Sequence, residues 1–235
     1  GSAIPGANGP SLNLGPAEPG DTGDYAVVVR NGHGEASSGP VRVTVVVPPS
    51  ITRAPLPQVA ILGSPATFSV EATGSAPLAY QWQLNAVDIP GANDPTFTVP
   101  SVQQTNAGQY TVRVSNAGGS TTTLPVALDV IVPPTITTQP ADTLVVIGDP
   151  LHLEVEATGT APFSYQWEFN GAPIVGATAR TFDLGSANPN HSGSYRVRVG
   201  NGAGSVLSRF AVVTVNGPGG TLQFSNVGIR TPVTA

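Results

Sequence analysis

Histidines, carboxylates and hydroxyl groups are the side chains of this protein that could take part in acid–base or nucleophilic chemistry. The chain has no cysteine, and all nine of its basic residues are arginine, which excludes thiolate nucleophiles, cysteine-bound metals and lysine Schiff bases. The histidines His33, His152 and His191 are far apart in sequence, and no G-x-S-x-G nucleophile motif occurs. We therefore predict no catalytic residue, no cofactor and no metal site, and we expect the histidines at surface or turn positions.

Two carboxylates, Glu154 and Glu156, lie two residues apart and so share one face of a predicted strand. A glycosidase needs its two carboxylates on opposite sides of a cleft, so a solvated outer face is the better interpretation. The loop spacing of an EF-hand is also absent. A weak calcium site between domains is the alternative for two further acidic pairs, Asp142 with Asp149 and Asp21 with Asp24.

The composition limits the class of partner. The net charge is −5, charged residues make up 10% of the chain, and no basic run is present to neutralise phosphates, so nucleic acid is not an expected partner. No apolar run reaches the roughly 18 residues of a membrane span. The 40% of hydrophobic residues is enough for packed cores.

An internal repeat determines how the chain is organised. Tyr25, Tyr110 and Tyr195 follow one another at a step of 85 residues (110 − 25 and 195 − 110). The same step joins Trp82 to Trp167 and repeats the turn that begins at Asn31. A period of this length is too long for a solenoid unit and corresponds to a whole small domain.

Strand signals fill each period. Residues 66–72 and 151–157 alternate apolar and polar side chains, and residues 80–84 and 110–114 continue the alternation. Clusters of Gly, Pro, Asn and Ser separate these runs, and no stretch shows a sustained helical period. Several short strands at regular spacing predict an all-β fold of antiparallel β-sandwiches.

These residues carry a family resemblance. A strand ending at Val70, then Tyr80-Gln-Trp82, then Gly-x-Tyr110-x-Val112, resembles strands B, C and F of the immunoglobulin fold, with its Trp on strand C and its Tyr at the E–F corner. Valines stand where disulfide-bearing members have cysteines. The chain is most similar to the cysteine-free, I-set-like repeat domains of large secreted or surface proteins of bacteria. The predicted structural core consists of Trp82, Trp167, Val70, Val112, Val155, Val197, Tyr25, Tyr110 and Tyr195.

The repeat sets the expected domain boundaries. We predict immunoglobulin-like domains at 48–132 and 133–217, the C-terminal part of a further domain at 1–47, and a linker with the start of another segment at 218–235. Pro-Pro pairs at 48–49 and 133–134 restrict the backbone, so we expect stiff linkers and domains arranged as beads on a string. Residues 1–47 lack strands B and C and would expose an apolar face, which predicts that this segment is unstable or pairs with another copy.

The favoured function is non-enzymatic: a secreted or cell-surface spacer or adhesive region of a larger protein. The alternatives are recognition of an extracellular polysaccharide or surface protein by the array itself, and an accessory region of a secreted hydrolase. Most aromatic side chains belong to the predicted core. The rings that remain are Phe163, Phe169 and Phe210, which replace Leu78, Leu84 and Pro125 of the preceding repeat. Of these, Phe163 and Phe169 are the candidate ligand-binding residues that we select, with additional core packing as the alternative.

Overall fold

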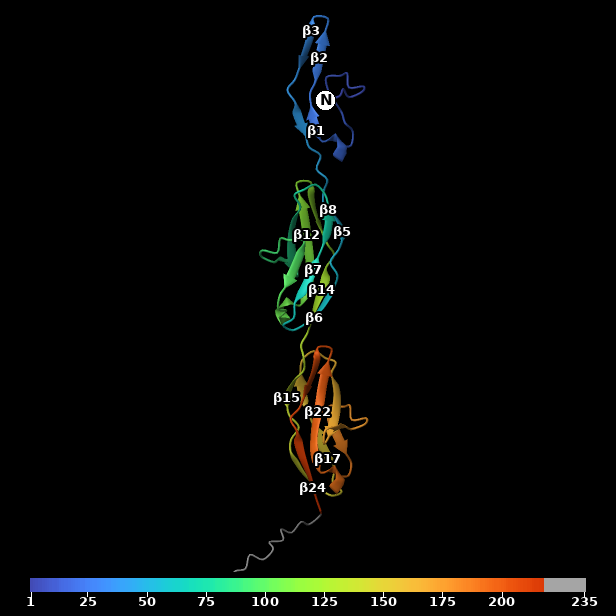
Figure 1. The fold of residues 1–235 in the computed structure, drawn as a ribbon, viewed down its shortest axis with the longest axis vertical. Helices are drawn as coiled ribbons and strands as arrows, with labels where there is room; N and C mark the ends of the chain where they lie inside the picture. Colours follow the sequence, from blue (N-terminus) through green and yellow to red (C-terminus); the bar gives the residue numbers. More distant parts are fainter. Residues whose placement is uncertain (218–235) are drawn as a thin grey trace, which may run out of the picture. The chain divides into compact units, whose positions relative to one another are not determined.

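The computed structural model describes residues 1–217, and residues 218–235, with the further segment predicted there, lie outside the described part. The chain divides into two compact units, Gly1–Asp129 and Val130–Ala235. Strands connected by turns, with three single-turn 3₁₀ helices, make up the described residues (Figure 1). The predicted all-β architecture is confirmed.

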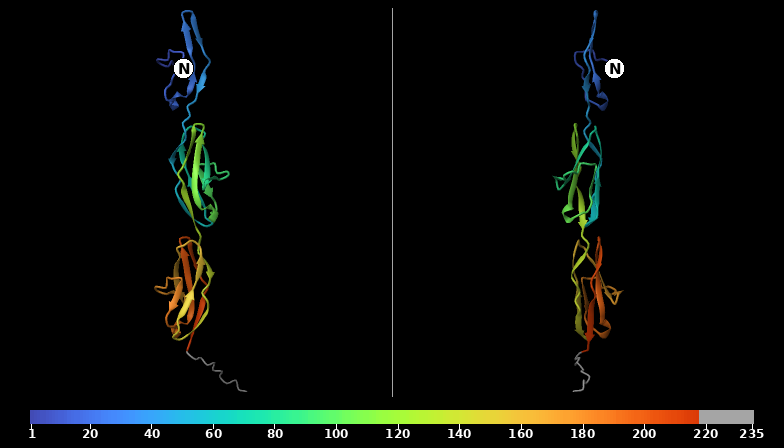
Figure 2. Two further views of the ribbon diagram at one scale, coloured as in Figure 1. Left: turned by 180° about the vertical axis from the view of Figure 1, so that it is seen from behind. Right: turned by 60° about the vertical axis from the view of Figure 1, so that its left-hand side comes forward.

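Each unit contains one β-sandwich, which we call sandwich 1 (strands β5–β14) and sandwich 2 (strands β15–β24), each with two layers of strands (Figure 2). In sandwich 2 one sheet has the order β16-β24-β22-β19-β20, with β23 also paired to β22, and the opposite layer holds the pairs β15-β18 and β17-β21. Its strands are β15 (Thr135–Thr138), β16 (Thr143–Val146), β17 (Leu151–Glu154), β18 (Glu156–Thr158), β19 (Ser164–Phe169), β20 (Ala172–Pro173), β21 (Thr181–Leu184), β22 (Gly193–Asn201), β23 (Gly204–Leu207) and β24 (Ala211–Asn216).

Sandwich 1 repeats this topology, with the sheet order β10-β9-β12-β14-β6, β13 paired to β12, and the pairs β5-β8 and β11-β7. Its strands are β5 (Ser50–Arg53), β6 (Gln58–Ile61), β7 (Ala66–Ser69), β8 (Glu71–Thr73), β9 (Ala79–Leu84), β10 (Val87–Asp88), β11 (Thr96–Val99), β12 (Gly108–Asn116), β13 (Gly119–Thr122) and β14 (Val126–Ile131). The two sandwiches therefore use equivalent residues for equivalent strands.

The alternation seen in the sequence sorts side chains between core and solvent. In β17 the burial pattern alternates strictly, with Leu151 and Leu153 inside and His152 and Glu154 outside. At the centre of sandwich 1 the indole nitrogen of Trp82 donates a hydrogen bond to the carbonyl of Asp94 at 2.9 Å. Such a bond satisfies the one polar atom of a buried indole.

The tyrosine of each repeat closes a 3₁₀ turn. The hydroxyl of Tyr110 donates to the carbonyl oxygen of Asn106 at 2.9 Å, at the end of η2 (Gln104–Asn106). Tyr195 makes the same bond after η3 (Pro189–His191), and Tyr25 makes it after η1 (Pro19–Asp21). Burial raises the pKa of Tyr110 and of Tyr195, because the phenolate would lose its hydration.

Residues 1–47 form only four short strands: β1 (Gly23–Tyr25), β2 (Val28–Asn31), β3 (Gly34–Ser37) and β4 (Val41–Val43). These strands pair as β1-β4 and β2-β3. Val29 and Val41 are 64% and 65% exposed, and Tyr25 is only partly buried. This segment exposes apolar side chains, as expected for a sandwich without its B and C strands, and its pairing with another copy stays a prediction.

Candidate functional site

Of the nine residues predicted for the core, all but Tyr25, which is only partly buried, lie where the two sheets of a sandwich meet. Trp82 and Trp167 are fully buried, as are Val112, Val155 and Val197. Val70, Tyr110 and Tyr195 are buried to within a few per cent. The ring of Phe68 stacks on Tyr110 with centroids 4.6 Å apart. Val70 and Val112, which stand where the resemblance places the cysteines of disulfide-bearing members, are therefore part of this apolar packing.

The linker before sandwich 2 is held by side chains of the sandwich itself. The side-chain nitrogen of Asn201, at the end of β22, donates to the carbonyl oxygen of Val132 at 2.7 Å and to that of Thr160 at 2.8 Å. Thr160 also accepts from the amide of Val132 through Oγ1 at 2.9 Å and donates its own amide to the Val132 carbonyl at 3.0 Å. We call this set of four hydrogen bonds the Val132 clamp.

The same arrangement recurs 85 residues earlier, around Val47. Asn116 donates to the carbonyl oxygens of Val47 and Ser75 at 2.7 and 2.9 Å. Ser75 accepts from the Val47 amide at 2.9 Å and donates to the Val47 carbonyl at 3.0 Å. We call this set the Val47 clamp. Each linker is thus fixed to the sandwich that follows it.

A glycine allows each linker to approach this closely. Gly159 adopts φ +139°, and a Cβ there would lie 2.8 Å from the carbonyl oxygen of Pro133. Gly74, its equivalent, adopts φ +148°, and a Cβ there would lie 3.0 Å from Cα of Pro49. Both the backbone conformation and the space therefore require glycine.

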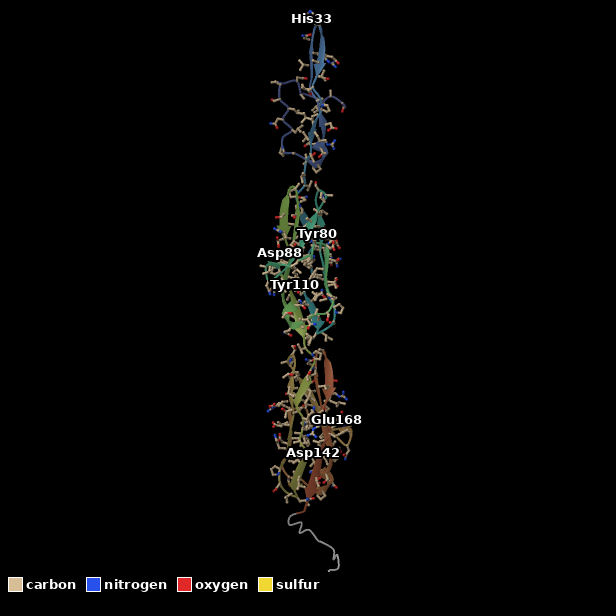
Figure 3. The ribbon with its side chains drawn as sticks, turned by 90° about the vertical axis from the view of Figure 1, so that its left-hand side faces the viewer. His33, Tyr80, Asp88, Tyr110, Asp142 and Glu168 are labelled. Carbon is tan, nitrogen blue, oxygen red and sulfur yellow. The ribbon has the colours of Figure 1, made fainter. Side chains whose placement is uncertain are left out.

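Among the titratable residues predicted at surface or turn positions, His33, His152, Glu154 and Glu156 are exposed and His191 is partly exposed. Arg180 forms ion pairs with Glu154 at 4.0 Å and with Glu156 at 3.5 Å. His33 lies in the turn between β2 and β3 (Figure 3), and His191 ends η3. On the outer face of β17 and β21, His152 Nδ1 contacts Asp183 Oδ1. These pairs are solvated, and none lies in an enclosed pocket.

Replacing His152 by alanine is expected to raise the pKa of Asp183 toward its ordinary value. The hydrogen bond from His152, followed by one from Thr181, holds the pKa of this carboxyl below its usual range. The lowered pKa contributes stability that is present above the unfolded-state pKa and is lost as the pH falls through the folded-state pKa. Carbon-detected NMR titration of Asp183 measures the change, and His33→Ala is the control. An unchanged Asp183 pKa in His152→Ala would contradict the assignment.

One carboxylate of sandwich 2 is buried. The side chain of Glu168, labelled in Figure 3, is 8% exposed. Its Oε2 accepts from Arg196 Nε at 2.6 Å. Its Oε1 lies 3.7 Å from a guanidinium nitrogen of Arg198. The guanidinium carbon of Arg196 also lies 4.8 Å from the centre of the Phe210 ring. We call these four residues the Glu168 cluster.

The two candidate ligand-binding aromatics pack inward. Phe163 and Phe169 are partly buried against the core of sandwich 2, and the Phe169 ring lies 4.8 Å from that of Tyr195. These contacts supply additional packing, which was the alternative considered for both rings. Their role in binding stays a prediction. Phe210 is 46% exposed, which is more than either Phe163 or Phe169.

Sequence reasoning did not identify the clamps or the Glu168 cluster. Asn116 and Asn201 were visible as repeated turn residues, and the hydroxyls of Ser75 and Thr160 recur at the same step. The recurrence of both the asparagine and the hydroxyl residue at one step was the sequence signal from which the clamps could have been predicted. Glu168 has no acidic equivalent in the other repeat, since Gln83 stands there, so the period gave no indication of it.

Within residues 1–217 no group of three or more His, Cys, Asp or Glu side chains is arranged to hold a metal ion. The same residues contain no helix long and apolar enough to cross a membrane. Two surface hollows are open to solvent; one is lined by residues 174–179 and 181–184 and the other by residues of the β2–β3 hairpin. Neither hollow joins a nucleophile to a histidine and a carboxylate.

Comparison with known proteins agrees with this geometry. Over 228 residues the chain is 31% identical to the muscle M-line assembly protein unc-89 of Caenorhabditis elegans, covering 84% of this chain and 3% of that protein. It is 29% identical to the basement membrane-specific heparan sulfate proteoglycan core protein of Mus musculus, over 94% of this chain and 6% of the relative. Endoglucanase C of Cellulomonas fimi is 29% identical over 72% of this chain and 16% of its own length.

Among solved structures, the I-band fragment I67–I69 from titin superposes with a TM-score of 0.64 at 25% identity, covering 74% of this chain and 68% of the titin fragment. The chain thus spans only a small part of the curated relatives that it matches. Two of the three relatives named above are animal proteins, so they give no support for a restriction to bacteria.

The matched domain type indicates no catalytic family, and the match to endoglucanase C covers only 16% of that enzyme's length. The sequence profile of the immunoglobulin domain matches residues 48–116 and 133–201, which are the segments that carry the buried Trp, the corner Tyr and the clamp Asn. The chain therefore belongs to the immunoglobulin domain family.

Proposed function

We propose that this chain is a non-enzymatic spacer in a secreted or cell-surface protein, in which immunoglobulin domains at 48–132 and 133–217 hold other parts of that protein at a fixed separation. The observation that carries this proposal is the repeated clamp. A spacer must transmit orientation from one domain to the next, and a freely jointed linker cannot do so. The clamps restrict the backbone rotations of each linker and so make it less like a freely jointed chain.

The Val132 clamp leaves little free chain. Strand β14 ends at Ile131, and the next residue, Val132, already has its amide and its carbonyl bonded to Thr160 and Asn201. Pro133 and Pro134 follow, and their rings fix φ. The backbone between the two domains therefore has few rotatable bonds that are not held by hydrogen bonds or rings.

An accessory region of a secreted hydrolase is the second candidate. The match to endoglucanase C covers 72% of this chain but only 16% of that relative, which places the similarity in a limited part of a larger enzyme. In that case the domains would space a catalytic module from its substrate, so the physical role of the clamps is the same.

Spin labels test the spacer role directly. The chain has no cysteine, so Ser101→Cys and Ser186→Cys provide two unique attachment sites at exposed, repeat-equivalent positions. A narrow distance distribution between the labels is expected for the unmodified linker. A broad distribution would contradict the spacer proposal.

Asn201→Ala in this labelled protein is expected to broaden the distribution and to destabilise sandwich 2 by about 1–3 kcal/mol, because two hydrogen bonds to partly buried carbonyls are lost. Pulsed dipolar spectroscopy measures the distribution, and urea unfolding measures the stability. Asn116→Ala is the matched control, since it opens the Val47 clamp and should leave this distance unchanged. If Asn201→Ala leaves the distribution narrow, the clamp is not what restricts the linker.

A further inference from the structure

The outer face of the large sheet in sandwich 2 differs from the same face of sandwich 1 at positions that touch one another. Glu168, Arg196 and Phe210 replace Gln83, Thr111 and Pro125, which precede them by 85 residues. In sandwich 1 the contact is neutral, with Thr111 donating to Gln83 at 3.1 Å. In sandwich 2 it is the Glu168 cluster. All three changes fall on one contiguous surface, although core packing does not require any of these side chains.

The Glu168 cluster carries an uncompensated positive charge. One buried carboxylate faces the guanidinium groups of Arg196 and Arg198. Arg196 is well bonded at 2.6 Å, whereas Arg198 makes one longer contact at 3.7 Å and its side chain is 48% exposed. The neighbouring charges, Arg209 and Asp142, pair with each other at 3.8 Å and add no net charge. Arg198 therefore has donors available to an anion.

An exposed aromatic ring lies beside these charges. Phe210 is 46% exposed, and Arg196, which lies against the ring, is fixed in turn by Glu168. Arg196 and Arg198 lie two residues apart on one face of β22, which corresponds to about 6.7 Å along the strand. The apolar ring thus lies against Arg196, and the exposed Arg198 follows two residues along the same face of β22.

We propose that this surface binds a polysaccharide made of sugar acids. Arg198 would pair with a sugar carboxylate through two parallel N–H donors, the geometry that guanidinium and carboxylate favour. The C–H face of an adjacent sugar would pack on Phe210. Binding sites commonly combine such an apolar surface with a few well-placed polar groups. This site is separate from the clamps, so it does not depend on the spacer role.

An acidic peptide fits this surface less well. Peptides bind sheets most readily by adding a strand to an open edge. Here the arginines are on β22, which is already paired with β19, β23 and β24. Its backbone has no open edge for a further strand, and the surface offers only side chains.

The test uses the whole chain and three probes of similar length: tetragalacturonate, the neutral galactose tetramer and tetraglutamate. Isothermal titration is expected to show saturable binding of tetragalacturonate that weakens with added salt, and little binding of the other two. Phe210→Ala and Arg198→Gln are each expected to weaken this binding by about tenfold, the effect of losing one charge-assisted or packing contact. Circular dichroism verifies that both variants are folded.

Arg113→Gln is the matched control, because Arg113 occupies the position equivalent to Arg198 in sandwich 1 without the phenylalanine or the buried carboxylate. It should change the affinity less than about twofold. The proposal is overturned if tetragalacturonate does not bind saturably, if tetraglutamate binds as tightly, or if Arg113→Gln weakens binding as much as Arg198→Gln. The spin-label experiment is unaffected by any of these outcomes.

Discussion

Trp82→Ala is expected to unfold sandwich 1 while sandwich 2 stays folded. Trp82 is fully buried, its ring packs against Phe68 and Phe97 at centroid distances of 6.0 and 6.1 Å, and its nitrogen bonds the Asp94 carbonyl. Truncating a buried aromatic side chain costs about 3–5 kcal/mol. This is a large share of the roughly 5–15 kcal/mol that stabilises a whole domain.

Sandwich 1 has no disulfide whose contribution to the free energy of unfolding could offset this loss. A native disulfide in a small domain contributes about 2–5 kcal/mol, and this chain has none. In thermal unfolding, near-ultraviolet circular dichroism sums the aromatic signals of both sandwiches, so the transition of sandwich 1 is the part that Trp167 fluorescence does not follow. Because the chain has only two tryptophans, the fluorescence of Trp167 in the variant reports on sandwich 2 alone.

Trp82→Phe is the control for shape, and it should cost clearly less than the alanine substitution because part of the ring contact is kept. Trp167→Ala should give the mirror-image result, with sandwich 2 unfolded and Trp82 fluorescence unchanged. A cooperative melt of sandwich 1 near the wild-type temperature in Trp82→Ala would show that the core does not depend on this side chain.

Arg196→Leu is expected to destabilise sandwich 2 by about 2–4 kcal/mol, because it removes the close partner of a buried carboxylate. Glu168 would keep only the longer contact to Arg198. Its 8% exposure leaves little room for water to replace the lost bond. Urea unfolding monitored by Trp167 fluorescence measures the loss.

The double variant Glu168→Leu with Arg196→Leu distinguishes the stability contributed by the ion pair from that contributed by side-chain packing. Replacing both partners of a buried pair by apolar residues is often close to neutral, so the double variant should recover most of the stability lost in Arg196→Leu. Thr111→Leu, at the equivalent position of sandwich 1, is the control and should have a smaller effect. A double variant less stable than Arg196→Leu would contradict this account.

The sequence predicted the architecture because the fold depends on local and repeated signals. Alternation in residues 151–157 reflects the two-residue period of a strand, and β17 and β18 lie there. The recurrence of Tyr110 and Tyr195 at one step marked the same corner in both sandwiches, and both hydroxyls bond the carbonyl four residues earlier. Each of these signals is read from a short stretch of residues or from the repetition of that stretch along the chain.

The clamps and the Glu168 cluster required the tertiary structure. Asn201 bonds Val132, 69 residues away in sequence, and nothing near either residue specifies that contact. Glu168 meets Arg196 because β19 and β22 pair in a register that places these two residues opposite each other. A shift of one residue would turn every side chain of the strand to the other face. The sequence alone thus determined which segments form strands, whereas the register and the closure of the sandwich decided which side chains meet.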